Sequence, residues 1–243
     1  MRIAMVRKLL LTLLTAVVLA DEPKPVAQIF QTGEFHGGEV SATTGEQWLA
    51  LIPRSNCLAD LSLVSLHVDP VQDAILDKDD EQSGKRVSFD NNLQQEIFLF
   101  RNIPGVGPGP INTITSFEDI EPNEPVNLIL KSGVKYTLTL ICPPRRKVEK
   151  DERQTASLVL KRGKVRQTLA RYSFPYVDSR LDPGSTGSVR LYWAGDLQQN
   201  GQLSLIVDLS EGGNLSSPTL FLSSKAGSKT LVFRVADFST TGC

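Results

Sequence analysis

Residues 191–222 read LYWAGDLQQNGQLSLIVDLSEGGNLSSPTLFL. An aromatic and apolar start at Leu191–Trp193 precedes a polar loop, and the apolar runs Leu205–Val207 and Thr219–Leu222 follow it. Short apolar runs that are bounded by Gly, Asn and Pro are typical of β-strands and their turns. The stretch therefore predicts three consecutive strands that are joined by tight turns.

The same pattern continues toward the N-terminus as two hairpin signals. Alternating runs at residues 126–130 and 134–140 flank one glycine-containing turn, and runs at residues 157–160 and 165–169 flank another. Short turns with glycine between such runs indicate β-hairpins. Further strand-like runs occur at residues 26–30, 47–52, 58–71, 86–89, 96–101 and 231–235.

Short strands with frequent turn residues predict an all-β fold, either an antiparallel β-sandwich or two stacked small β-subdomains. A closed barrel is the main alternative. The polar, proline-broken segment 143–153 is the expected linker, between an N-terminal subdomain at residues 21–142 and a C-terminal one at residues 154–243. Its basic cluster, Arg145–Lys147, is interpreted as a solvated part of the linker, with a site for an acidic partner as the alternative.

Residues 1–20 have the pattern of a secretory signal peptide. Three basic residues precede an apolar run at residues 9–19, which is too short to span a membrane, and cleavage is expected before Asp21. We therefore expect a periplasmic or secreted protein with no membrane insertion after removal of the signal. The remaining chain has a small excess of acidic residues, which argues against nucleic acid as a partner.

Three cysteines, Cys57, Cys142 and Cys243, follow the predicted signal peptide. Exported proteins meet conditions that permit disulfides, and an odd number leaves one thiol free or paired with another molecule. A bridge from Cys243 to Cys57 or Cys142 would tie down the C-terminus. The alternative is that these residues are reduced thiols that act as small hydrophobic side chains.

The polar loop after Gly195 resembles the calcium loop of FG-GAP and related repeats, whose pattern is G-D-x-[DN]-x-D-G-x-x-D-[LI]. The resemblance implies oxygen ligands for a hard cation at these positions: Asp196, Gln198, Asn200, Gln202 and Ser204. Only the first of them is a carboxylate, and affinity rises with the charge of the ligands. We therefore expect no bound metal, or weak calcium binding, and no other cofactor.

The signal peptide, the series of hairpins and the closing Gly242-Cys243 are together similar to uncharacterised exported bacterial β-rich proteins in which this loop is fully acidic. That resemblance implies an exported all-β protein and supplies no function. A second acidic group, Asp77–Glu81, has an alternative interpretation as a cation site, but Lys78 lies among the acids and the glycine of a calcium loop is missing. We interpret it as a solvated loop.

The sequence has no G-x-S-x-G elbow, no H-E-x-x-H helix and no Walker loop. The chain contains two histidines: His36 lies near Glu34 and Glu39, and His67 lies near Asp69. A histidine base with a carboxylate partner, or Cys57 as a nucleophile, is the catalytic alternative.

Few side chains in the sequence titrate near neutral pH, which favours a protein that is not an enzyme. We expect an exported β-protein that binds a protein or glycan partner through its loops. The alternative is a small exported hydrolase whose active site is assembled from scattered residues. The two differ in what a structure should show, because a hydrolase needs a cleft that gathers histidine and carboxylate, whereas a binder needs an exposed apolar or aromatic patch.

Overall fold

The computed structural model describes residues 26–54, 57–90, 95–143, 153–177, 180–181, 189–210, 214–224 and 230–241. The predicted signal peptide, most of the expected linker and Cys243 lie outside these residues. The described chain is almost entirely antiparallel β-structure, which confirms the all-β fold class; its helical segment is the 3₁₀ turn η1 (Gly37–Glu39).

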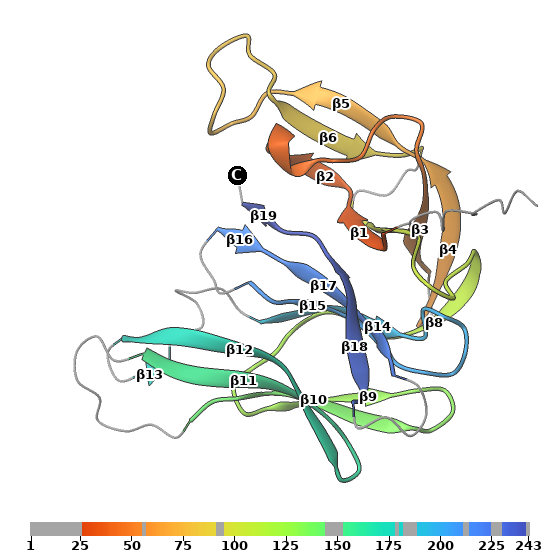
Figure 1. The fold of residues 1–243 in the computed structure, drawn as a ribbon, viewed down its shortest axis with the longest axis vertical. Helices are drawn as coiled ribbons and strands as arrows, with labels where there is room; N and C mark the ends of the chain where they lie inside the picture. Colours follow the sequence, from red (N-terminus) through yellow and green to blue (C-terminus); the bar gives the residue numbers. More distant parts are fainter. Residues whose placement is uncertain are drawn as a thin grey trace, which may run out of the picture.

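The largest sheet has nine strands in the order β1-β7-β3-β4-β8-β14-β15-β17-β18. Their bounds are β1 (Gln28–Gln31), β7 (Phe98–Arg101), β3 (Gln47–Arg54), β4 (Leu58–Ser65), β8 (Gly109–Asp119), β14 (Arg190–Gly195), β15 (Ser204–Asp208), β17 (Pro218–Ser223) and β18 (Val232–Asp237). The sheet curves so strongly that its two edges approach each other (Figure 1). Phe30 on β1 and Phe238, just after β18, have ring centroids 4.0 Å apart.

A second sheet has five strands in the order β13-β12-β11-β10-β9 and covers one face of the C-terminal strands of the first (Figure 1). Its strands are β9 (Pro125–Ile129), β10 (Lys135–Ile141), β11 (Arg153–Arg162), β12 (Val165–Val177) and β13 (Arg180–Leu181). Two smaller sheets complete the fold, one of β2 (Gly33–Phe35), β6 (Gly84–Ser88) and β5 (His67–Val71), the other of β16 (Leu215–Ser216) and β19 (Thr240–Thr241).

Two hydrophobic cores explain why the stretch at residues 191–222 is apolar on both faces. Trp193, Ile206 and Leu220 pack into the core inside the curved sheet. Their neighbours Leu205 and Phe221 pack into the core beneath the five-stranded sheet. Because successive side chains of a strand point to opposite faces, a strand between two cores reads as a continuous apolar run.

The sheets do not follow the boundary that was expected at residues 143–153. Strands β10 and β11 lie on either side of that segment, and they pair, with Leu138 opposite Leu160. Strands β8 and β14 pair as well, although the whole of β9–β13 lies between them in the sequence. Both large sheets therefore combine strands from the two expected subdomains.

Candidate functional site

A cavity of about 720 Å³ lies where three connections meet beside strand β8. The tip of the β3–β4 hairpin contributes Cys57 and Leu58, and the turn after β9 contributes Lys131. The loop after β14 contributes Asp196 and Gly201. The loop that was singled out in the sequence therefore lines this cavity.

A mainly apolar groove of about 220 Å³, whose lining also includes Arg54 and Glu96, continues from this cavity along β8. Both spaces are lined by Cys57, Leu58, Thr113 and Ile114, so they adjoin. The groove is lined by five consecutive residues of β8, from Thr113 to Phe117. Because side chains of a strand alternate between its faces, such a run indicates that the groove follows the edge of β8.

The edge of β8 that faces β4 is only partly paired. Pairing between the two strands ends at Leu58 and Asn112, and the N–H of Thr113 then donates to the carbonyl of Cys57 at 3.0 Å. Strand β8 continues to Asp119 with β14 on its other side. Within the described ranges, no strand pairs with the β4-facing edge of β8 beyond this point.

Aromatic rings form the floor of the groove. Phe98 and Phe117 both lie edge-on to Tyr192, with ring centroids 5.4 and 6.2 Å away. Phe117 is 47% exposed, and its backbone φ is +54°, a region that bulky residues rarely adopt. Such a conformation costs on the order of 1–3 kcal/mol and occurs most often at functional sites.

Hydrogen bonds hold the floor of the groove in place. The Tyr192 hydroxyl donates to Asp208 Oδ2 at 3.0 Å and lies 2.9 Å from Ser216 Oγ. Burial, together with the nearby Asp208 carboxylate, raises the pKa of Tyr192 to about 12. Trp193 Nε1 donates to Thr113 Oγ1 at 3.1 Å. With these polar atoms engaged, the two rings offer the groove mainly carbon surface.

In the loop that resembles a calcium site, side-chain oxygens accept hydrogen bonds from the N–H groups of the same loop. Asp196 is buried, and its two carboxylate oxygens accept from the N–H groups of Asn200 at 3.0 Å and Gly201 at 2.7 Å. The side-chain oxygen of Asn200 accepts from the N–H of Gln202, also at 3.0 Å. The Asp196 carboxylate thus closes the turn through backbone N–H groups.

Two other expected ligands, Gln198 and Ser204, have surroundings of their own. Gln198 donates its side-chain amide to the carbonyl of Pro104 at 2.8 Å, which docks the loop on the segment before β8. Ser204 is buried at the start of β15. No three His, Cys, Asp or Glu side chains gather as a metal cluster within the described residues. Weak calcium binding at Asp196 stays a prediction.

Asp77 in the second acidic loop is likewise used to fix the main chain. Its carboxylate accepts from the N–H groups of Asp73 at 2.8 Å and Ser83 at 2.7 Å, and it also accepts from the Ser83 hydroxyl. Glu81 accepts from the N–H of Lys78 at 3.1 Å. These contacts are those of a loop that is closed by its own carboxylates.

The histidines find carboxylates that are distant in sequence. His36 Nδ1 contacts the buried Asp73 carboxylate, and His67 Nε2 lies 3.2 Å from Asp90. Glu34 instead accepts from Arg86, at 2.6 Å. Neither histidine lines the cavity, the groove or a third cavity near β1 and β18. The structure therefore brings together a histidine and a carboxylate, but away from these three spaces.

The pair of His36 and Asp73 predicts a pH-dependent contribution to stability. The hydrogen bond to Asp73 raises the pKa of His36 above 6.5, and the same bond lowers the pKa of Asp73 below 3.8. The contribution is complete between these two values. It is lost as the pH rises through the raised pKa of His36, or falls through the lowered pKa of Asp73.

We therefore expect the difference in the free energy of unfolding between the wild type and His36→Gln to be larger at about pH 6 than at about pH 9. Urea denaturation at the two pH values measures it. His67→Gln is the matched control, because His67 is exposed and holds an exposed Asp90. An equal difference at both pH values would show that the pair does not titrate as its contacts imply.

The two described cysteines have different surroundings. Cys57 is an exposed free thiol at the mouth of the cavity, with a backbone φ of +56°. Cys142 is a buried free thiol, and burial raises its pKa. Cys243 lies outside the described residues, so a bridge from it to either thiol stays a prediction.

Comparison of the chain with protein-family models, curated proteins and solved structures finds no match. Among the described residues, no helix has the length and the apolar character that crossing a membrane requires.

Proposed function

We propose that the protein is an exported, non-catalytic β-protein that binds a protein partner at the apolar groove along β8 and the loops around it. The observation that carries the proposal is the unpaired edge of β8 next to an aromatic floor. An unpaired edge presents free N–H and C=O groups in a row, and proteins usually cover or blunt such edges. Here the edge borders a groove that is deep enough to hold side chains.

An extended segment of the partner fits this geometry by strand addition. Its main chain would pair with β8 from residue 114 onward, and alternate side chains would enter the groove against Phe98 and Tyr192. The pairing would be short, because the positive φ of Phe117 turns β8 away from an extended course. Apolar side chains are favoured, since exposed carbon of Leu58 and Phe117 surrounds the groove.

The second candidate, a small hydrolase, is favoured by one observation, the contact of His36 with Asp73. A hydrolytic site also needs a nucleophile within hydrogen-bond reach of the base and a space for the substrate. Ser83, the hydroxyl beside this loop, donates instead to Asp77, and His36 lines none of the three spaces described above. These contacts support the binding role.

Tryptophan fluorescence can test the proposal directly. The chain contains two tryptophans, and Trp193 lines the groove whereas Trp48 lines the third cavity. In a Trp48→Phe background, Trp193 alone reports on the groove. We expect apolar peptides of about seven residues, selected by display against the wild type, to change this fluorescence at micromolar concentrations.

Leu58→Asp should raise the dissociation constant of such a peptide about tenfold or more, because it places a charge in the apolar groove. Leu63→Asp is the matched control, since Leu63 is exposed on β4 and lines neither the groove nor the cavity. Equal binding by the two variants would refute the groove as the binding site. Hydrolysis of the peptide that is lost in His36→Gln would favour the enzyme instead.

A further inference from the structure

Positive charge is concentrated in the part of the chain that forms the five-stranded sheet. Residues 125–181 contain 13 Lys and Arg against 4 Asp and Glu, whereas the whole chain contains 26 against 27. The described residues of that segment contain nine Lys and Arg and no Asp or Glu. One layer of the molecule is therefore strongly basic while the rest of the chain is acidic.

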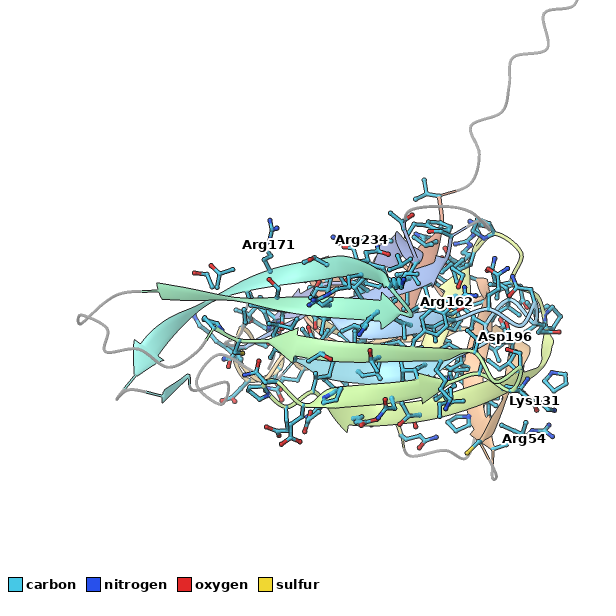
Figure 2. All side chains as sticks on the ribbon, turned by 90° about the horizontal axis from the view of Figure 1, so that it is seen from below. Arg54, Lys131, Arg162, Arg171, Asp196 and Arg234 are labelled. Carbon is cyan, nitrogen blue, oxygen red and sulfur yellow. The ribbon has the colours of Figure 1, made fainter. Side chains whose placement is uncertain are left out.

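The pairing register places several of these charges on the outer face of the sheet. Leu138 and Leu160 point into the core beneath the sheet, so Thr137 and Lys161, their neighbours along β10 and β11, point outward. Lys161 is paired with Arg166 of β12, so Arg166 also points outward. Thr137, Lys161 and Arg166 therefore lie side by side on three neighbouring strands. Figure 2 looks onto this sheet.

Two further cations share this face. Lys135 lies two residues before Thr137, and Arg171 is paired with the outward Ser157. We call the set Lys135, Lys161, Arg166 and Arg171 the basic face. All four are exposed, and none forms an ion pair with a described acidic residue. Figure 2 shows Arg171 on β12 at one side of the sheet.

The pairing of cations on this sheet lowers the stability of the isolated protein. Like charges that lie directly opposite each other on antiparallel strands are destabilising, and Lys161 and Arg166 are such a pair. Nothing acidic in the described chain offsets them. Side chains that lower stability without a partner in the fold are expected where a function requires them.

Hydroxyl groups lie between the charges, together with the apolar side chains of Val159 and Ile141, which share this face. Thr137, Thr139 and Ser157 lie outward on the central strands of the sheet, and Thr155 and Thr168 are exposed on β11 and β12. Hydroxyl, ammonium and guanidinium groups hydrogen-bond both carboxylate or sulfate oxygens and sugar hydroxyls. Tyr136 and Tyr172 are buried on the other side of the sheet, so neither of these two rings is available for stacking nucleic-acid bases.

We propose that the basic face binds an anionic polysaccharide, one that carries carboxylate or sulfate groups. The site is separate from the groove along β8 and does not depend on it. A row of cations with intervening hydroxyls on one face of a sheet matches an extended, regularly charged chain of sugars. Membrane lipids match it less well, since surface-binding segments need extensive apolar surface beside their cations. In the described part of this sheet, the large apolar side chains that are exposed are Ile129, opposite Lys135, and Val165, next to Arg166.

The test uses the purified protein and two defined probes, a polygalacturonate oligosaccharide and a heparin-derived oligosaccharide, in a binding titration over a range of salt concentrations. We expect at least one probe to bind with an affinity that falls as salt rises. The double variant Lys161→Gln/Arg166→Gln should bind about tenfold more weakly at low salt, with a salt dependence shallower by about two released counterions. Its melting midpoint should be equal or higher, because the opposed like charges are gone.

The control variant Arg86→Gln/Arg190→Gln also removes two exposed cations, both of which hold acidic partners elsewhere, Glu34 and Asp119. It should bind as the wild type does. If the two double variants lost affinity equally, the binding would depend only on the net charge of the protein, and the proposal would be overturned. Tighter binding of duplex DNA or of vesicles rich in anionic lipid would overturn the assignment to polysaccharide, and so would no binding of either oligosaccharide.

Discussion

Replacing Asp208 with alanine is expected to lower the free energy of unfolding by about 3 kcal/mol, because a buried carboxylate leaves its donors without a partner. Asp208 Oδ1 accepts from the N–H groups of Ser210 at 2.8 Å and Ser217 at 3.0 Å, while Oδ2 accepts from Tyr192. The carbonyl of Asp208 accepts from Tyr172 of the five-stranded sheet at 3.2 Å. The residue thus joins polar groups of both large sheets.

Chemical denaturation measures the loss, and a fall of about 6–12 °C in the melting midpoint should accompany it. Tyr192→Phe removes one donor and keeps the carboxylate, so it should cost about 1 kcal/mol. Asp237→Asn is the matched control, since Asp237 forms an exposed pair with Arg234 of the kind that contributes about 0–1 kcal/mol. If Asp208→Ala cost no more than this control, the network would not stabilise the fold.

Replacing Asp196 with alanine is expected to cost about 2 kcal/mol and to loosen the loop beside the cavity. The substitution leaves the N–H groups of Asn200 and Gly201 without their acceptor inside the turn. Asp196→Asn should cost less, because one acceptor oxygen remains. Peptide binding at the groove should weaken only modestly in either variant, since Asp196 lines the cavity and not the groove.

A measurement with calcium tells whether the Asp196 loop is a metal-free turn or a calcium site. With both carboxylate oxygens engaged, excess calcium or EDTA should leave the melting midpoint of the wild type unchanged. A rise of several degrees with calcium, absent in Asp196→Asn, would show that the loop opens and binds the ion after all.

Much of the fold was predictable because strands leave a local pattern. The runs at residues 47–52, 126–130 and 134–140 overlap strands β3, β9 and β10. Strand β8 was not predicted. It begins at a glycine and a proline, and a bulge opposite Ala194 and Gly195 interrupts its alternation.

The candidate site was less predictable, because its parts meet only through long-range pairing. The sequence placed Asp196 in a tight loop correctly, yet it gave no sign that Pro104 and Cys57 lie beside that loop. His36 similarly meets Asp73, 37 residues away, through the packing of two loops. The hairpin that contains Lys161 and Arg166 was predicted, but the alignment of these two cations on one face was not, since that register is a property of the folded sheet.

The insertion of β9–β13 between β8 and β14 has a consequence for how the chain acquires its structure. Strands β8 and β14 are about 70 residues apart in the sequence, so the chain loses the entropy of closing a long loop before their contacts stabilise it. Folds rich in such long-range pairs fold slowly. Strands β1, β3, β4, β7 and β8 of the nine-stranded sheet emerge early in synthesis, but β8 cannot pair with β14 until residue 195 is available. During that interval the edge of β8 that later pairs with β14 is unpaired along its whole length, and unpaired edges make a nascent chain prone to aggregation.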